Sequence, residues 1–284
     1  MAQTAVLDYL NRFDEVQANF KAQELVDFMN GHIDIPVIIV ALYLALVLYV
    51  PNVIMKARNA LKCQSFFALW NFILTVFSVV GSFYTVPHIV SVIYNRGLRY
   101  SACAEPHEFY FDGRVGFWVA IFAFSKIPEL MDTVFLVIQK KDIIFLHWYH
   151  HATVMLYCWH GYSQKIATGL WFASMNFSVH SIMYLYYFLG AIGARSLIRP
   201  IAPLITTLQL LQMVVGMAVT IASFVWSLDG EGCHVDPANS RLGLIMYTSY
   251  FILFAALFKK LYLTPGGRKK TADVTVGVEE KKRK

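Results

Sequence analysis

The sequence predicts an all-α polytopic membrane protein with seven transmembrane helices. Apolar residues make up 57% of the 284 residues and charged residues only 15%, a composition that is unusual for soluble domains. The apolar runs are continuous over about 20 residues, enough for a helix to cross about 30 Å of hydrocarbon, and they lack the alternation of a transmembrane barrel. The expected spans are 35–55, 65–90, 115–138, 143–161, 168–190, 201–227 and 242–262.

The distribution of Lys and Arg predicts how these spans are oriented. One set of loops, together with the C-terminal tail, carries 16 of these residues, and the opposite set carries 7. Because cytosolic loops are enriched in Lys and Arg, we expect a cytosolic C-terminus and an N-terminus on the far side. The regions would be a lumenal segment (1–34), a membrane domain (35–263) and a cytosolic basic tail (264–284).

The net charge of +6 is then mainly a property of the cytosolic face. Such a surface suits anionic lipid head groups and anionic soluble substrates, and it gives no indication of nucleic-acid binding. The segment 1–34 has mixed charges and no signal-peptide pattern, so the first span is expected to direct insertion. Within the segment 1–34, apolar residues recur at roughly helical spacing between positions 4 and 30, which predicts an amphipathic helix at the membrane interface.

The first span has no ionisable residue between Asp34 and Lys56, so we expect it to face lipid as an anchor. Cys103 and Cys233 both fall in far-side loops. In a secretory-pathway membrane that side is oxidising, so the two thiols could form a disulfide or remain free.

Charged residues lie inside the third span, which should be apolar. Lys126, Glu129 and Asp132 would each cost about 3 kcal/mol in the middle of the membrane. Lys126 and Glu129 are three residues apart and can pair on a helix, and Thr133 continues that face. Pro128 interrupts the helical hydrogen bonds. These groups must face one another, partner helices or water, either around a site or as a network that only fixes helix register.

Three further spans carry polar residues at helical spacing. In the fourth span, three histidines at positions i, i+3 and i+4 share one face of the helix, and ionisable groups inside a membrane usually mark a functional site. The fifth and sixth spans each add a polar stripe. The residues of these three spans are His147, His150 and His151, then Asn176, His180, Tyr184 and Tyr187, then Thr206, Gln209 and Gln212.

Counting from the cytosolic ends of the spans places all these polar groups at similar depth, roughly 6 to 20 Å below the surface at 1.5 Å per residue. We therefore expect one buried chamber, open to the cytosol and surrounded by six of the seven helices. The far halves of the same helices are apolar and aromatic. A polar mouth with an apolar closed end suits a fatty acyl-CoA, although a pocket for an isoprenoid or a sterol would look similar.

Four motifs in this order resemble the ELO/ELOVL family of very-long-chain fatty acid elongases. They are Lys126-x-x-Glu129-x-x-Asp132-Thr133, His147-x-x-His150-His151, Met175-Asn176-x-x-Val179-His180-x-x-Met183-Tyr184-x-Tyr186-Tyr187 and Thr206-x-x-Gln209-x-x-Gln212. The resemblance implies a 3-ketoacyl-CoA synthase of the endoplasmic reticulum that joins acyl-CoA to malonyl-CoA. It also implies a disulfide between Cys103 and Cys233. Trp148 and Tyr149 resemble the branch that acts on saturated and monounsaturated chains.

The resemblance and the chemistry together suggest roles for these residues. An imidazole can attack a thioester and carry the acyl group, with His150 as first choice and His151 as second. His147 would serve proton transfer and orientation, while His180 and Asn176 would polarise the malonyl carbonyl and hold the enolate. The expected substrate-binding residues are Lys126, Glu129, Asp132, Thr133, Tyr184, Tyr187, Gln209 and Gln212, with Lys140, Lys141, Arg195 and Lys259 for the CoA phosphates or for lipid.

The expected ligands are acyl-CoA, malonyl-CoA as co-substrate and membrane lipids, with no bound cofactor and no metal. Expected protein partners are the reductase and dehydratase of an elongation cycle, and a homo-oligomer is a further option. Lys281 and Lys282 match a dilysine retrieval signal for the endoplasmic reticulum. Cys158 is a rival nucleophile. A histidine-liganded metal-dependent lipid oxidase or hydrolase and a non-catalytic lipid-binding protein remain alternatives.

Overall fold

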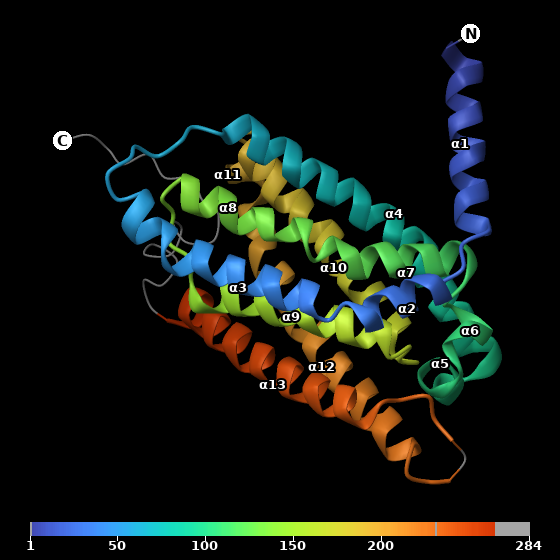
Figure 1. Ribbon diagram of the computed structural model, residues 1–284. Coiled ribbons are helices and arrows are strands. Elements are labelled where there is room, and N and C mark those ends of the chain that lie inside the picture. Colours follow the sequence, from blue (N-terminus) through green and yellow to red (C-terminus); the bar gives the residue numbers. More distant parts are fainter. Residues whose placement is uncertain (1, 231, 265–284) are drawn as a thin grey trace.

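A computed structural model describes residues 2–230 and 232–264, and every regular element in this part of the chain is helical (Figure 1). The long helices run side by side as α3 (Asp34–Leu48), α4 (Gln64–Arg96), α7 (Gly113–Ser125), α9 (Phe145–Ser163), α10 (Gly169–Ala191), α12 (Ala202–Trp226) and α13 (Pro237–Phe258). The shorter helices are α1 (Ala2–Ala18), α2 (Gln23–Gly31), α5 (Leu98–Cys103), α6 (Pro106–Phe109), α8 (Met131–Ile138) and α11 (Arg195–Ile198). The basic tail with its dilysine motif lies outside the described residues.

The outer surface of the helices identifies a membrane protein. Four stretches are long and apolar enough to cross a bilayer: Asp34–Ile54, Gln64–Arg96, Arg195–Trp226 and Pro237–Leu263. Large apolar side chains on them are exposed, such as Leu42 at 66% and Phe83 at 72%, and exposure on this scale suits a hydrocarbon solvent. The other three predicted spans coincide with the helical segments that carry the charged, histidine and asparagine motifs.

The third predicted span is helical but interrupted. Helix α7 ends at Ser125, a single 3-10 turn follows over Pro128–Leu130, and α8 begins at Met131. Pro128 has no backbone N–H and its ring excludes a regular α-helical path, so the interruption falls at the residue that the sequence indicated. The charged motif lies at this interruption, where Lys126 and Glu129 are each only 2% exposed.

The first predicted span does more than face lipid, and this expectation is wrong for one side of the helix. Tyr43 is 3% exposed and Val47 8% exposed in α3, and both belong to a buried cluster that includes Ala152 of α9. Lipid-facing and protein-facing residues of such a helix are both apolar, so composition cannot separate them. The Tyr43 hydroxyl is a polar signal on the side of this helix that faces the protein.

The N-terminal segment forms two helices where one was expected. In Figure 1, α1 projects away from the other helices, whereas α2 lies against them. Val26 and Met29 of α2 are almost fully buried, and the Trp159 indole donates a hydrogen bond to the Met29 carbonyl oxygen at 2.9 Å. Helix α2 is therefore partly a component of the protein core.

A disulfide fastens the loops at one end of the bundle. Cys103 of α5 is bonded to Cys233, and the His234 backbone N–H donates to the Cys103 carbonyl oxygen at 2.8 Å. The His234 carbonyl oxygen in turn accepts from the Ala167 backbone N–H at 3.0 Å. The disulfide and these two hydrogen bonds thus hold together the three loops that precede α6, α10 and α13. These loops lie at the end of the bundle opposite the histidine motif, where α9 ends.

Removal of this disulfide is expected to destabilise the protein. The bond closes a loop with a sequence separation of 130, and cross-links of native loops commonly contribute about 2–5 kcal/mol to the free energy of unfolding. A Cys103→Ser/Cys233→Ser variant should therefore unfold at a clearly lower temperature in detergent. Cys63→Ser, which changes a free cysteine, is the control, and equal midpoints for the two variants would contradict the prediction.

Candidate active site

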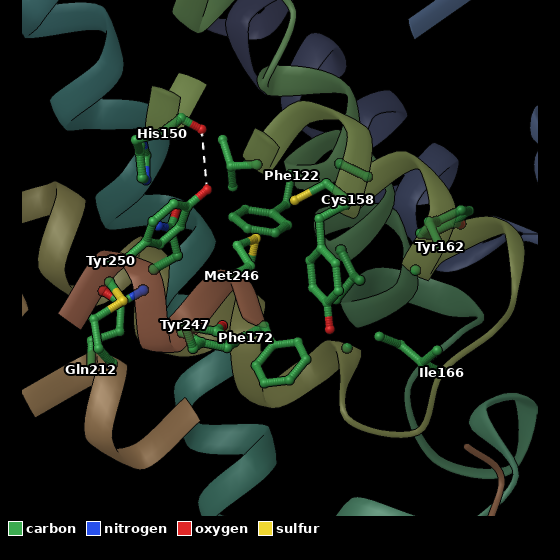
Figure 2. A pocket seen from close by; sticks show the side chains of 18 of the residues that line it. Phe122, His150, Cys158, Tyr162, Ile166, Phe172, Gln212, Met246, Tyr247 and Tyr250 are labelled. Carbon is green, nitrogen blue, oxygen red and sulfur yellow. Dashed lines mark hydrogen bonds between the residues drawn. The ribbon is translucent and has the colours of Figure 1, made fainter. Parts of the chain in front are cut away.

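Two cavities meet inside the bundle. The polar cavity has about 1550 Å³ of space unfilled by protein atoms, and its lining includes His147, His151, His180, Tyr184, Thr206 and Gln209. The apolar cavity has about 660 Å³, and its lining includes Val154, Tyr157, Cys158, Phe172, Met246 and Tyr247 (Figure 2). Four residues line both cavities: His150, Asn176, Gln212 and Met213.

The three histidines of α9 lie together, as their spacing predicted. The ring centroids of His147 and His151 are 4.6 Å apart, and those of His150 and His151 are 5.5 Å apart. His151 is 7% exposed, and its Nδ1 atom is buried without a hydrogen-bond partner in the described residues. His150 differs from both neighbours because it alone of the three lines both cavities.

Helix α13 supports His150 from the side, although its sequence gave no chemical clue. The Tyr250 ring packs at 4.9 Å from the His150 ring, and its hydroxyl donates to the His150 carbonyl oxygen at 3.2 Å, which Figure 2 shows as a dashed line. The same hydroxyl lies 2.6 Å from the Thr153 hydroxyl. Among residues 2–230 and 232–264, no hydrogen bond occupies a ring nitrogen of His150, so its lone pair is available to a ligand.

A buried polar chain connects the charged motif to α10. Lys126 Nζ donates to Glu129 Oε1 at 2.7 Å and to Asn176 Oδ1 at 3.1 Å. An ammonium group has only donors, so the Asn176 atom beside it must be the amide oxygen. The amide nitrogen then faces His180 Nε2 at 3.1 Å and donates to it. Neutral His180 must therefore carry its proton on Nδ1.

The half-buried carboxylate of Asp132 is held by two donors from other helices. The Trp70 indole nitrogen of α4 donates to Asp132 Oδ1 at 2.8 Å, and the Tyr184 hydroxyl of α10 donates to Asp132 Oδ2 at 2.9 Å. Asp132 and Tyr184 both line the polar cavity. Trp70 was not among the predicted site residues, since tryptophan in a transmembrane span usually needs no chemical explanation.

A second polar chain reaches the site from α3. The Tyr43 hydroxyl lies 2.9 Å from the Thr133 hydroxyl, and the Thr133 hydroxyl lies 2.9 Å from His147 Nε2. Thr133 is fully buried and does not line the cavity. Its position in the charged motif is therefore explained by its contact with a histidine.

The remaining predicted residues lie around the polar cavity or near it. Tyr187, Gln209 and Gln212 are part of its lining, whereas Lys140, Lys141, Arg195 and Lys259 are not. The Lys141 ammonium lies 5.6 Å from the centre of the Phe67 ring, which does line it. Burial lowers the pKa of Lys141, and the Arg195 guanidinium acts in the same direction. Lys259 lies two residues before Leu261 and three before Tyr262, which are two further lining residues.

In the part of the chain that the structure describes, no three or more His, Cys, Asp or Glu side chains are grouped so that they could hold a metal ion. His147 and His180 each have Nε2 engaged by a protein group instead.

Comparison with known proteins agrees with the arrangement of motifs. Residues 28–270 match the model of the ELO family, described as the GNS1/SUR4 family. The chain is 46% identical over 280 residues to fatty acid elongase 3 of Trypanosoma cruzi (strain CL Brener), which covers 90% of this chain and 93% of that protein. It is 41% identical over 217 residues to very long chain fatty acid elongase 6 of Drosophila melanogaster, which covers 76% of this chain and 68% of that protein.

The family match covers most of the chain and includes every residue of the two cavities. A further relative, very long chain fatty acid elongase 4 of Trypanosoma cruzi (strain CL Brener), is 48% identical over 259 residues, 91% of this chain and 90% of that protein. The chain belongs to the ELO (GNS1/SUR4) family.

Proposed function

We propose that the protein is a fatty acid elongase that condenses a long-chain acyl-CoA with malonyl-CoA to give 3-ketoacyl-CoA, carbon dioxide and CoA. One observation carries the proposal: His150 lies where a polar and an apolar cavity meet. An acyl-CoA could place its hydrocarbon tail in the apolar cavity and its CoA portion in the polar one, which would put the thioester beside His150. The names of the relatives support the same reaction.

The enzyme would lie in the endoplasmic reticulum membrane with seven spans, a lumenal N-terminus and a cytosolic C-terminus. The Lys and Arg distribution supports this orientation, as does the disulfide at the end of the bundle that would then be lumenal. Six helices would surround a chamber that opens to the cytosol, where both CoA substrates occur. The product would pass to a reductase and a dehydratase.

Condensation would proceed through an acyl group carried on His150. A ring nitrogen attacks the thioester carbon, so that a C–N bond forms, the C–S bond breaks and CoA leaves as a thiolate. The N–H proton of the acylated imidazole then passes to this thiolate, so that CoA departs as the thiol. Malonyl-CoA then loses carbon dioxide, and its C2 carbanion attacks the acyl-imidazole carbon. The new C–C bond replaces the C–N bond, and the departing imidazolate takes up one proton from solvent, which returns His150 to its neutral starting form.

The neighbouring groups would stabilise the negative charge that develops in these steps. His180, fixed with its proton on Nδ1 by Asn176, can donate to the malonyl thioester oxygen as it becomes an enolate. The positive Lys126 behind Asn176 adds favourable charge. Lys140, Lys141, Arg195 and Lys259 would bind CoA phosphates at the mouth. Malonyl-CoA is a co-substrate here, and the scheme needs no bound cofactor or metal.

The test is a condensation assay on the purified chain in detergent. With palmitoyl-CoA and malonyl-CoA labelled in its carboxyl group, an elongase releases labelled carbon dioxide and 3-ketostearoyl-CoA in equal amounts. Hydrolysis of palmitoyl-CoA without that product would instead favour a lipid hydrolase. Binding of palmitoyl-CoA with no turnover would favour a lipid carrier.

The end of the apolar cavity should limit the length of the acyl chain. Its lining there includes Ile166 and Gly169, and the Tyr110 hydroxyl donates to the Ile166 carbonyl oxygen at 2.6 Å. Ile166→Ala removes three carbon atoms from this end, and each further buried methylene contributes about 0.8 kcal/mol. We expect preference for acyl chains about two carbons longer, measured as product distribution by mass spectrometry.

The matched control is Ile89→Ala, which removes the same atoms from a buried residue that lines neither cavity. It should lower stability and leave the product distribution unchanged. An Ile166→Ala enzyme with the wild-type distribution would show that the acyl tail does not extend into this cavity.

A further inference from the structure

We propose that Tyr43, acting through Thr133, holds neutral His147 in the tautomer with its proton on Nδ1, which makes His147 a hydrogen-bond donor to the polar cavity. Tyr43 lies outside every motif that indicated the site. The catalytic meaning of this assignment rests on the proposed function, whereas the tautomer itself does not.

The three groups form one continuous chain from three different helices. Tyr43 belongs to α3, Thr133 to α8 and His147 to α9. The hydroxyls of Tyr43 and Thr133 are 2.9 Å apart, and the Thr133 hydroxyl is 2.9 Å from His147 Nε2. Tyr43 is 3% exposed and Thr133 is fully buried, so neither hydroxyl can exchange its protein partner for bulk water.

The number of available protons determines which group donates in each of these two hydrogen bonds. Each hydroxyl has one proton to donate, and in the described part of the chain the Tyr43 hydroxyl has no partner except Thr133. If Tyr43 donates to Thr133 and Thr133 donates to Nε2, both protons are used. If His147 donated from Nε2 instead, one of the two buried hydroxyls would keep a proton without an acceptor, which is costly.

The direction of these two hydrogen bonds determines whether His147 can act as a base or as a hydrogen-bond donor. A nitrogen that accepts from Thr133 carries no proton and is not free to act as a base. The proton of neutral His147 is then on Nδ1, and His147 lines the polar cavity. A neutral imidazole can stabilise an oxyanion by donating a hydrogen bond. The expected role of His147 in proton transfer is thereby replaced by a role as a donor to the thioester oxygen.

His180 arrives at the same tautomer by a different route. Lys126 orients the Asn176 amide, which donates to His180 Nε2, just as Tyr43 orients the Thr133 hydroxyl. Both flanking histidines therefore present Nδ1–H, while His150 keeps its ring nitrogens unoccupied in the described residues. In this arrangement His150 is the nucleophile, and His147 and His180 are the two hydrogen-bond donors.

The test measures the position of the His147 proton directly. In protein labelled with ¹⁵N-histidine, the His147 signals are identified by their loss in His147→Gln. We expect Nδ1 protonated in wild type and in Thr133→Ser, which retains the hydroxyl, and Nε2 protonated in Thr133→Val. Tyr43→Phe should give a mixture, because Thr133 is then free to donate or accept.

Kinetics on the same proteins provide a second readout. Thr133→Val should lower kcat about 100-fold, as loss of an oxyanion donor does, and Tyr43→Phe about 10-fold, as loss of an orienting partner does. The KM values for both CoA substrates should change less than about twofold, because the donor acts on charge that develops in the transition state. Thr133→Ser should restore most of kcat.

Two variants control for the loss of hydroxyls elsewhere in the bundle, one at the fully buried Thr85 and one at the half-buried Tyr84. Thr85 is fully buried and donates to the Gly81 carbonyl oxygen at 2.8 Å, and it lines neither cavity. Thr85→Val and Tyr84→Phe should leave the His147 tautomer and kcat unchanged. A His147 proton on Nε2 in wild type overturns the proposal, as does an unchanged tautomer in Thr133→Val. If wild type forms no 3-ketoacyl-CoA while its His147 proton is on Nδ1, the tautomer assignment is supported and the elongase function fails.

Discussion

Lys126→Met is expected to lower the free energy of unfolding by about 3–5 kcal/mol and to abolish condensation. Lys126 and Glu129 form a pair in which both side chains are almost fully buried. Without the ammonium group, Glu129 keeps only the Ser125 hydroxyl, which donates to Oε1 at 2.7 Å, and its Oε2 atom already lacks a partner in the described residues. An uncompensated charge in a membrane helix bundle is the source of the large effect.

A double variant separates stability from activity. In Lys126→Met/Glu129→Gln both charges are absent, and a buried ion pair can often be replaced by uncharged groups without loss of stability. We therefore expect recovery of most of the unfolding temperature in detergent. Activity should not recover, because Asn176 has lost the donor that oriented its amide toward His180. Recovery of both would show that the ion pair serves only helix packing.

The matched control breaks an exposed ion pair. Arg114 and Asp14 are 2.6 Å apart, with side chains 47% and 51% exposed. Arg114→Met should cause no marked loss of stability or activity, since solvent screens exposed pairs. The difference in unfolding free energy between Lys126→Met and Arg114→Met measures how much burial strengthens the effect of breaking an ion pair.

The sequence predicted the centre of the site because burying its charged and polar side chains in a membrane costs free energy. Lys126, Glu129 and the histidines of α9 stand out in apolar segments, and helical spacing places each set on one face. Depth along the spans then indicated which sets could meet. The contact of Lys126 with Asn176 agrees with that argument, since the two residues come from different helices.

The supporting residues were not predicted, for an equally physical reason. Tyr43, Trp70 and Tyr250 are aromatic residues that are common in membrane helices whether or not their polar atoms have a role. Only the three-dimensional contacts show that each is hydrogen-bonded to the site or to its backbone. The same ambiguity explains why the sequence predicts a purely lipid-facing α3, because the buried and lipid-facing sides of this helix are equally apolar.

His150→Ala is expected to abolish the acyl adduct and to lower condensation by at least about 1000-fold, as loss of a catalytic nucleophile commonly does. After incubation with palmitoyl-CoA alone, intact-protein mass spectrometry should show one bound palmitoyl group on wild type and none on this variant. The ring stands between the two cavities, so removing it leaves both binding regions in place. Affinity for palmitoyl-CoA should therefore change much less than kcat.

His151→Ala and Cys158→Ala decide between the possible carriers. His151 lines only the polar cavity and has a buried Nδ1 atom, so an acyl group bound there would leave its hydrocarbon tail among polar side chains. Cys158 lines only the apolar cavity, where the CoA portion of the substrate would have to enter an apolar space. Both variants should retain the adduct. Loss of the adduct in Cys158→Ala alone would move the nucleophile to sulfur, and loss in His151→Ala alone would move it to the neighbouring imidazole.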